Sequence, residues 1–386
     1  MINNSGWQYY PLSEACVICD SNRKPVNTKE RTKRIEGKKL ADLFPYYGAT
    51  GQVGHIDDYL IDGEYVLLGE DGAPFLNMSA QKAYLISGKS WVNNHAHILQ
   101  SKTDNRFLCY YLNCFDYKGY VCGTTRLKLT QGQMKSIPVP VPLIEEQQRI
   151  VTRIEGLFSE LDSAVETLQK TRQQLEVYRQ AVLKEAFAEC QSTVKVNDVC
   201  KHVTDGDHMP PPKAETGIPF IMISNIDKNV INWNGTAFVN REYYENINDK
   251  RRPQKGDVLY TVTGSFGIPV LVDFDREFCF QRHIALLRPN NRIIQKYLYY
   301  VMQEPEVYQQ AEKKSTGTAQ KTVSLSVLRN IEIPFVESVK EQERIVEKIE
   351  SQLSVCDGIE RTIEESLQQA EAMRQSILKK AFEGRL

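Results

Sequence analysis

Several features are missing from this sequence, and each absence excludes a class of protein. No apolar run approaches the roughly 18 residues that span a bilayer, and the first residues show no basic stretch followed by an apolar core. The nine cysteines form no regular framework, which predicts reduced thiols, and the close pair Cys16 and Cys19 lacks the second pair of a zinc site. We therefore expect a cytoplasmic chain that holds no metal.

Catalytic motifs are missing as well. Residues 88–90 (Gly-Lys-Ser) resemble the end of a phosphate-binding loop, but Ala83 stands where that loop needs a glycine. The sequence has no GxGxxG or HExxH motif, and no Asn or Asp followed by Pro-Pro and an aromatic residue, as adenine methyltransferases require. His95 and His97 alternate along an expected strand and are interpreted as surface or packing residues. We predict a protein that is not an enzyme and has no cofactor of its own.

A large charge of one sign is also absent, since 48 Lys and Arg against 49 Asp and Glu give a net charge of −1. The average hides a division along the chain. Residues 1–142 hold 16 basic against 13 acidic side chains, and residues 191–335 hold 18 against 16. Residues 143–190 hold 6 against 9, and residues 336–386 hold 8 against 11. Two mildly basic segments therefore alternate with two acidic ones, so the charge does not exclude a phosphate-binding surface.

What the sequence does contain is an internal repeat. Residues 146–151 (EQQRIV) match residues 341–346 (EQERIV), and the match continues without a gap to residues 187 and 382. About 19 of the 42 aligned positions are identical. Upstream the likeness is weaker but persists, as where Gly123 aligns with Gly317 and Val66 with Val258. The chain therefore consists of two copies of one unit, each a divergent globular part followed by a closely matched tail.

The tails are predicted to be long helices that pair with each other. Prolines at 138, 140 and 142 end the first globular part and stop a helix from extending back into it. Apolar residues then follow alternating steps of four and three, as in a coiled coil. They are Ile150, Ile154, Leu157, Leu161, Ala164, Leu168, Leu175, Tyr178 and Val182 in the first tail, and Ile345, Ile349, Cys356, Ile359, Ile363, Ala370, Met373 and Ile377 in the second. Thr171 interrupts the first series with a polar residue, and Gln352 and Ser366 interrupt the second. The alternative is that each tail packs on its own globular part.

The globular parts are predicted to be mixed α/β. Residues 65–68 and 257–262 are short β-type runs that end near glycine turns, and residues 107–112 and 296–302 have the spacing of short helices. The expected organisation is a globular part at 1–142, a helix at 143–190, a second globular part at 191–335 and a second helix at 336–386.

Basic clusters and polar turns in the globular parts suit binding to nucleic acid. Lysine and arginine neutralise phosphates, while Thr, Ser, Asn, Tyr and His in turns present donors and acceptors to base edges. Such clusters also occur on ordinary solvated surfaces. The candidate DNA-binding residues are Lys38, Lys39, Tyr46, Tyr47, Thr50 and Gln52 in the first part, and His208, Lys213, Asn225, Lys250, Arg251, Arg252, Thr263, Ser265, Arg282, His283, Lys313, Lys314 and Thr316 in the second.

The order of several short motifs resembles the specificity (S) subunit of Type I restriction–modification systems. These motifs are residues 205–208 (DGDH), 217–221 (GIPFI), 224–226 (SNI), 255–259 (KGDVL), 331–334 (IEIP) with 341–346, and 381–386 (AFEGRL). The likeness covers essentially the whole chain. The first globular part departs from it, since residues 46–51 (YYGATG) stand in place of a proline-rich Asp-Gly-x-His opening.

The resemblance implies that each globular part is a target recognition domain that reads one half of a split DNA sequence. It also implies that the two helices pair antiparallel and set the unread gap. Two methyltransferase subunits and, for restriction, two nuclease/translocase subunits would supply the chemistry, with S-adenosylmethionine, ATP and Mg on those partners. Two alternatives stay open: the recognition subunit of a Type IIG or BcgI-like enzyme, and a structural coiled-coil scaffold whose end domains bind protein.

Overall fold

The computed structural model describes residues 6–208, 211–317 and 320–386. It divides into two compact units, of which unit 1 comprises Met1–Gln169 and Ile363–Leu386 and unit 2 comprises Lys170–Thr362. Helices and strands are mixed in both, which confirms the predicted fold class. Each unit combines one globular part with one end of each long helix. No helix within the described ranges is long and apolar enough to cross a membrane.

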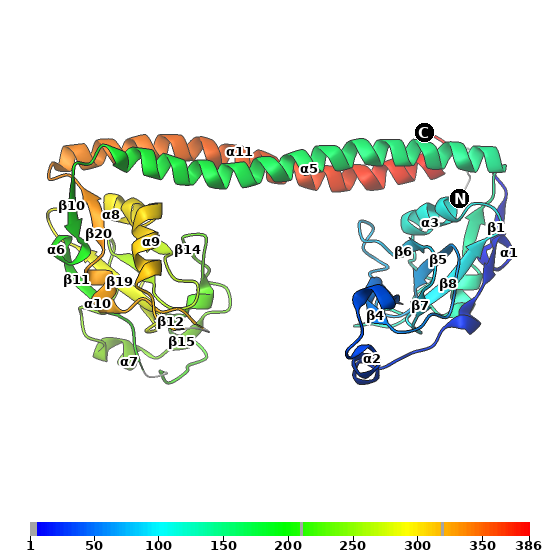
Figure 1. Cartoon of the computed structure of the whole chain (residues 1–386), viewed down its shortest axis with the longest axis horizontal. Coiled ribbons are helices and arrows are strands. Elements are labelled where there is room, and N and C mark those ends of the chain that lie inside the picture. Colours follow the sequence, from blue (N-terminus) through cyan, green and yellow to red (C-terminus); the bar gives the residue numbers. More distant parts are fainter. Residues whose placement is uncertain (1–5, 209–210, 318–319) are drawn as a thin grey trace. The chain divides into compact units, whose positions relative to one another are not determined.

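Most elements recur in the same order in the two units, and Figure 1 labels many of them. The globular part of unit 1 comprises β1 (Tyr9–Pro11), α1 (Leu12–Ala15), β2 (Cys16–Ile18), α2 (Thr28–Ile35), β3 (Phe44–Gly48), β4 (Gly51–Ile56), β5 (Tyr65–Gly69), β6 (Ala83–Ile86), β7 (Trp91–Val92), β8 (Ala96–Ser101), α3 (Asn105–Cys114), α4 (Gln131–Lys135) and β9 (Pro138–Pro140). The long helix α5 (Ile144–Ala188) follows it.

Unit 2 repeats most of this series, has no helix in the described residues between β11 and β12 where unit 1 has α2, and adds a few short elements. It comprises β10 (Ser192–Lys195), α6 (Val196–Val199), β11 (Cys200–Asp205), β12 (Ile218–Ile221), β13 (Ile226–Asp227), β14 (Val230–Ile231), β15 (Ala237–Val239), α7 (Arg241–Asn246), β16 (Val258–Thr261), β17 (Pro269–Leu271), β18 (Cys279–Phe280), β19 (Ile284–Pro289), α8 (Gln295–Val301), α9 (Pro305–Lys313), α10 (Leu325–Arg329) and β20 (Glu332–Phe335). The second long helix, α11 (Val339–Phe382), follows.

The sheets of the two units have one topology. Each unit has a four-stranded antiparallel sheet, in the order β2-β8-β5-β6 or β11-β19-β16-β17, and a three-stranded sheet, in the order β4-β3-β7 or β15-β12-β18. The register also matches, because Val66 pairs with Leu99 as Val258 pairs with Leu287. Strands β5 and β16 are buried almost throughout, which explains why they occur as continuous apolar runs in the sequence.

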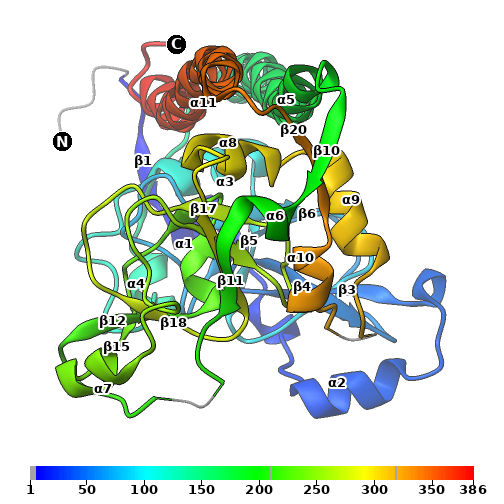
Figure 2. The ribbon, with the colours of Figure 1, turned by 90° about the vertical axis from the view of Figure 1, so that its left-hand side faces the viewer.

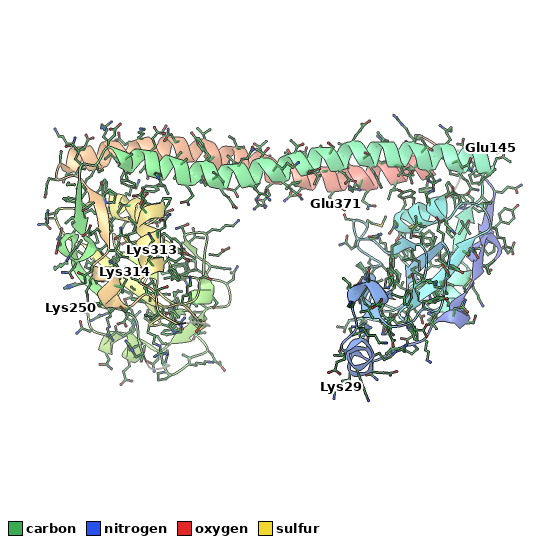
Figure 3. All side chains as sticks on the ribbon, viewed as in Figure 1. Lys29, Glu145, Lys250, Lys313, Lys314 and Glu371 are labelled. Atoms are coloured by element: carbon green, nitrogen blue, oxygen red, sulfur yellow. The ribbon has the colours of Figure 1, made fainter. Side chains whose placement is uncertain are left out.

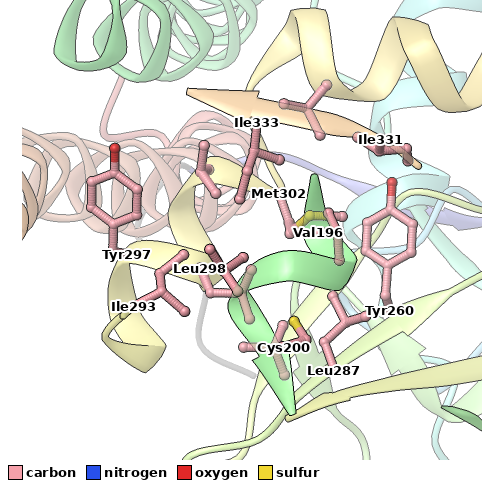
Figure 4. Packing of buried hydrophobic residues seen from close by; sticks show 14 of the residues in the cluster. Val196, Cys200, Tyr260, Leu287, Ile293, Tyr297, Leu298, Met302, Ile331 and Ile333 are labelled. Carbon is pink, nitrogen blue, oxygen red and sulfur yellow. The ribbon is translucent and has the colours of Figure 1, made fainter. Parts of the chain in front are cut away.

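A helix covers one face of each four-stranded sheet and links it to the long helices. In unit 2, α8 lies between the sheet and the helix pair, as Figures 1 and 2 agree. Figure 4 shows the resulting core, in which Tyr297 and Leu298 of α8 share one cluster with Leu287 of β19 and Val196. In unit 1, α3 has the corresponding place against β5 and β6.

The long helices pair antiparallel within each unit. In unit 2, Arg179 of α5 binds Asp357 of α11 at 2.6 Å. In unit 1, Arg374 of α11 forms the corresponding ion pair with Asp162 of α5. The repeat aligns Arg179 with Arg374 and Asp162 with Asp357. The same ion pair therefore occurs twice, once in each unit, with the two helices exchanging roles.

The predicted seam is correct at most positions and shifted by one residue at four. Ala164 is exposed, as are Tyr178, Ile359 and Met373 at 49%, 40% and 53%. The residues after two of them, Arg179 and Arg374, turn inward and pair with the opposite helix. Their long side chains reach across the seam and still place the charge at its edge.

Both ends of α5 are docked on globular parts. Near its start, buried Gln147 donates to the carbonyl of Pro142 at 2.8 Å and accepts from Thr103. The repeat-equivalent Gln342 of α11 donates to Val336 and accepts from the amide of Ile294 in unit 2. At the far ends, Phe187 packs on Tyr297, and Phe382 packs on Phe107 and Tyr111. Each tail therefore packs on both a globular part and the other helix.

Candidate nucleic-acid interface

One edge of the four-stranded sheet in unit 2 gathers polar side chains from three strands. Strand β11 ends at Asp205, and β16 ends just before Val262 and Thr263, while β19 begins just after Arg282 and His283. Because β11 and β16 both run antiparallel to β19, these ends meet at the same edge. They enclose a hollow of about 360 Å³ that Gln320, Thr322 and Ser324 also line.

A short loop completes this edge. The backbone of Thr322 pairs with that of Thr263, and Thr316 and Thr322 exchange two backbone hydrogen bonds of 2.9 and 2.8 Å. Gly317 (φ +99°) allows the loop to close, because a Cβ there would lie 2.3 Å from the carbonyl oxygen of Gln320. We call the set Asp205, His208, Thr263, Arg282, His283, Gln320 and Thr322 the strand-end site of unit 2.

The charges of this site are only partly neutralised. Asp205 accepts from His208 at 2.8 Å and from Arg251 at 3.4 Å. The exposed guanidinium of Arg282 has no acidic partner in the described part of the chain. Arg251 and Lys250 line a second hollow, of about 540 Å³, with Tyr243 and Asp207, whose side chains are hydrogen-bonded. Arg282 therefore lines one of the two hollows, and Lys250 and Arg251 line the other.

The same edge of unit 1 has the same backbone and different side chains. There Asp20 follows β2, Glu70 and Asp71 follow β5, and Asn94 and His95 precede β8. A loop that contains Arg126 and Lys128 closes the edge. We call the set Asp20, Arg23, Asp71, Asn94, His95, Arg126 and Lys128 the strand-end site of unit 1. Arg126 binds Asp71 at 2.7 Å, and His95 lies 3.5 Å from the same carboxylate.

A buried histidine contacts Asp20, a member of the strand-end site of unit 1. His97 is fully buried, with Nδ1 at 2.7 Å from an Asp20 carboxylate oxygen and Nε2 at 3.0 Å from the Leu129 carbonyl. Burial would raise the pKa of the Asp20 carboxyl, but His97, the amide of Ile98 and the guanidinium of Arg23 together lower it. His97 is thus a packing residue, one of the two roles predicted for it, while His95 is half-exposed at the site.

The predicted residues of unit 2 fall into three groups. His208, Thr263, Arg282 and His283 converge on one hollow, and Lys250 and Arg251 line the adjacent one. Arg252 lies over the Tyr244 ring and pairs with Asp249, while Lys213, Ser265, Lys313, Lys314 and Thr316 are exposed and do not line either hollow. The side chains of Lys250, Lys313 and Lys314, and of Lys29 in unit 1, can be followed in Figure 3.

Asn225 belongs to the structure of unit 2 rather than to its surface. It is buried, accepts from the amide of Met222 at 3.0 Å and donates to the Asn232 carbonyl. These internal hydrogen bonds use both ends of the amide, so we withdraw Asn225 as a DNA-contacting residue.

The predicted residues of unit 1 cluster on the hairpin of β3 and β4 and beside it. Thr50 and Gln52 are exposed at its turn, and Tyr47 is half-buried against Tyr84. Lys39 is exposed, and Lys38 pairs with Asp57 at 2.8 Å. The turn lies beside the strand-end site, because the Ala49 carbonyl is 3.0 Å from where Gly69 would carry a Cβ.

Tyr46 is also buried, although it was predicted to contact DNA. It is 2% exposed, its hydroxyl is hydrogen-bonded to the backbone of Val26, and the guanidinium of Arg31 from α2 covers its ring. Tyr46 therefore anchors the basic helix α2, whose Lys29 and Lys33 are exposed, and does not itself face DNA.

None of the seven residues of the strand-end site of unit 1 was among the predicted DNA-binding residues. In unit 2, Asp205, Gln320 and Thr322 were not predicted either. A signal for the loops existed in the aligned glycines Gly123 and Gly317, because a Cβ at either position would lie 2.3 Å from a carbonyl oxygen three residues further on.

The strand-end sites are rich in hydrogen-bonding side chains. No cluster of three or more His, Cys, Asp or Glu that could hold a metal occurs within residues 6–208, 211–317 and 320–386. Burial raises the pKa of the thiols of Cys16, Cys109, Cys200 and Cys279 to about 12, so these thiols are poor nucleophiles. Exposed Arg, His, Gln and Asn side chains are donors and acceptors of the kind that read base edges.

Fold and site together define a two-repeat recognition protein with paired helices. The family model for the Type I restriction modification DNA specificity domain matches residues 4–177 and 191–369, so the chain belongs to this family. It is a DNA target-recognition subunit of a type I restriction–modification system, which the matches favour over the alternative assignments.

Two relatives illustrate the likeness. A Haemophilus influenzae chain that carries the name type I restriction enzyme specificity subunit S.HindORF215P is 30% identical, over 98% of this chain and 97% of that one. The type I restriction enzyme EcoBI specificity subunit of Escherichia coli is 25% identical, over 67% of this chain and 60% of that one.

Two solved structures share the fold. A chain of a type I R-M system matches with a TM-score of 0.71 at 19% identity, covering all of both chains. The HsdS subunit from Thermoanaerobacter tengcongensis matches with a TM-score of 0.53 at 18% identity, covering 100% of this chain and 98% of that one.

Proposed function

We propose that this chain reads a split DNA target, with the strand-end site of each unit contacting one half of it. The observation that carries the proposal is that the two units share one backbone arrangement at this edge but differ in their exposed side chains. The sheets, their registers and the closing loops correspond in the two units, whereas the exposed side chains at the edge differ. Two units with the same backbone but different exposed side chains are suited to a target whose two halves differ in sequence.

Phosphate contacts would come from cations beside the strand-end sites. In unit 2 these are Lys250 and Arg251, and in unit 1 the exposed lysines of α2 and Lys38. Such contacts fix the position of the protein on the duplex and carry no sequence information themselves.

We further propose that the chain is not catalytic by itself and acts in the cytoplasm. Two methyltransferase subunits and, for restriction, two nuclease/translocase subunits would bind it, and S-adenosylmethionine, ATP and Mg would be held by those subunits. The long helices would set the gap between the half-sites. The purified chain should therefore neither methylate nor cut DNA with any of these cofactors added, and methylation by the chain alone would contradict this part of the proposal.

The test of DNA reading uses the chain in complex with its methyltransferase subunits. Sequencing the duplexes selected from a random library should give two short conserved stretches separated by a fixed unread gap. Retention should fall steeply with salt, and Lys250→Ala should weaken binding to every sequence alike and reduce the salt slope by about one. A complex that binds no DNA, or all duplexes equally, would refute the proposed function.

A further inference from the structure

The two strand-end sites are built on the same backbone hydrogen bonds, so their positions can be equated one by one. After β5 and β16, the amides of Glu70 and Val262 donate to the carbonyls of His95 and His283 at 2.7 and 2.9 Å. The amides of Gly72 and Gly264 donate to Leu127 and Lys321, at 2.9 Å in both units. His95 therefore corresponds to His283, and the residue before it, Asn94, to Arg282.

The closing loops give a second pair of equivalent positions. In unit 1 a Cβ on Gly123 would lie 2.3 Å from the carbonyl oxygen of Arg126, and in unit 2 a Cβ on Gly317 would lie 2.3 Å from that of Gln320. Arg126 therefore corresponds to Gln320. All four residues at these two positions are exposed.

The residue types are exchanged between the units. Unit 1 has an amide, Asn94, before the shared histidine and an arginine, Arg126, in the loop, whereas unit 2 has Arg282 before the histidine and an amide, Gln320, in the loop. Arginine can donate twice to N7 and O6 of guanine, and the amide of Asn or Gln can pair with N6 and N7 of adenine.

We propose that these two positions determine base specificity, with the arginine of each unit reading guanine and the amide reading adenine. The inference rests on the proposed function and specifies which residues distinguish the half-sites. Each half-site would thus contain a guanine and an adenine contacted at these positions, with the two bases read from exchanged places.

The surroundings of each side chain leave its recognition groups available. Arg126 binds Asp71 through Nε at 2.7 Å while its side chain stays 61% exposed, so the carboxylate orients the guanidinium and both terminal nitrogens can point outward. Gln320 borders a hollow whose other members include the uncharged Thr263, Thr322 and Ser324. Arg282 lines that hollow too, so both proposed readers of unit 2 face one cavity.

The experiment compares library selection by the complex containing the natural chain with selection by complexes containing single variants. Gln320→Arg should change the preferred base at one position of one half-site from adenine to guanine, by about five- to 150-fold in relative selection. Arg282→Asn should change a different position of the same half-site from guanine to adenine. Arg126→Gln should change guanine to adenine in the other half-site.

Lys321→Gln is the matched control, because Lys321 adjoins Gln320 in the loop and its amine binds Glu312 at 3.0 Å. This variant should leave every base preference unchanged. If the natural complex selects a split target and Gln320→Arg selects the same one, the inference fails while the proposed function stands. If the natural complex selects nothing, the proposed function itself fails.

Gln320→Ala covers the case in which the larger side chain prevents binding. Relaxed preference at a single adenine position would support the inference. An unchanged target, or loss of binding to all sequences by a folded protein, would overturn it, because either result would show that the amide reads no particular base.

Discussion

Replacing Asp257 by Asn should destabilise unit 2 more than any other isosteric change of a charged residue in its sheet. Asp257 lies immediately before β16 and forms a two-bond ion pair with Arg288 of β19, with both N···O distances at 2.8 Å. The side chains are 3% and 13% exposed. Asp257 also accepts from the amide of Gln254, and Arg288 donates to the carbonyl of Arg252. The pair therefore joins the sheet to the turn that carries Lys250 and Arg251.

The expected cost follows from burial. Removing one partner of a buried pair leaves an uncompensated charge and costs about 3 to 5 kcal/mol. Asparagine keeps the size of aspartate and one oxygen acceptor, so we expect the lower end, about 3 kcal/mol. With an unfolding slope of about 2 kcal/mol per molar urea, the midpoint for unit 2 should fall by about 1.5 M.

Hydrogen exchange read by mass spectrometry during urea unfolding can follow each unit separately. Strands β16 and β19 should lose protection early in the variant, whereas β5 and β8 of unit 1 should not, because Tyr65 and Gln100 occupy the equivalent positions there. Asp275→Asn is the control, since Asp275 binds Lys255 on the surface with the two side chains 79% and 57% exposed. Such a pair contributes about 0 to 1 kcal/mol. Equal effects of the two substitutions would refute the reasoning.

Three further predictions concern the two units and the helices between their globular parts. Gln342→Leu should lower the stability of unit 2 by about 2 to 3 kcal/mol, because the carbonyls of Arg292 and Val336 and the amide of Ile294 lose their hydrogen bonds to the buried amide of Gln342. A loss below 1 kcal/mol by urea unfolding would contradict this. His97→Leu should cost unit 1 most stability near pH 6 and less near pH 3. The lowered pKa of Asp20 contributes stability above its unfolded value of about 4, and that contribution is lost as pH falls through the lower folded value; a pH-independent difference in thermal melts would refute it. Inserting four residues between Leu168 and Leu175 lengthens α5 by roughly 6 Å, and with ~3.4 Å per base pair the unread gap should grow by about one or two base pairs. Methylation mapping that finds a binding-competent variant with the original gap would show that the helices do not set it.

The fold could be predicted because the sequence patterns that indicate it occur twice in the chain. The tails align without a gap, and the β-type runs at 65–68 and 257–262 occur as β5 and β16. The seam was misplaced by one residue at Tyr178 because apolar periodicity assigns an exposed tyrosine to the interface in preference to the adjacent arginine. Asp357 and Glu360, in a distant part of the sequence, pair with Arg179 and give it its inward position.

The candidate site was harder to predict because burial and loop closure depend on contacts between distant residues. Tyr46 and Asn225 are the residue types expected in a binding turn, yet each is buried by neighbours remote in sequence or by its own local fold. Conversely, Arg126 and Gln320 stand in no basic or aromatic cluster. They reach the edge because the loops after Gly123 and Gly317 return to the ends of β5 and β16.

The hydrogen bonds that fix the closing loops explain how two strand-end sites with different side chains can have the same backbone. The bonds that fix the closing loops join backbone groups: Thr322 to Thr316 in unit 2, and Lys128 to Cys122 in unit 1. Backbone groups are the same for every residue type except proline, so side chains at the exposed positions can change without removing these bonds. Substitutions of exposed residues outside such constraints usually alter stability by no more than about 0.5 kcal/mol. A change in the bases read therefore need not disturb the sheet, whereas a change at Gly123 or Gly317 would, because a Cβ at either position meets a carbonyl oxygen.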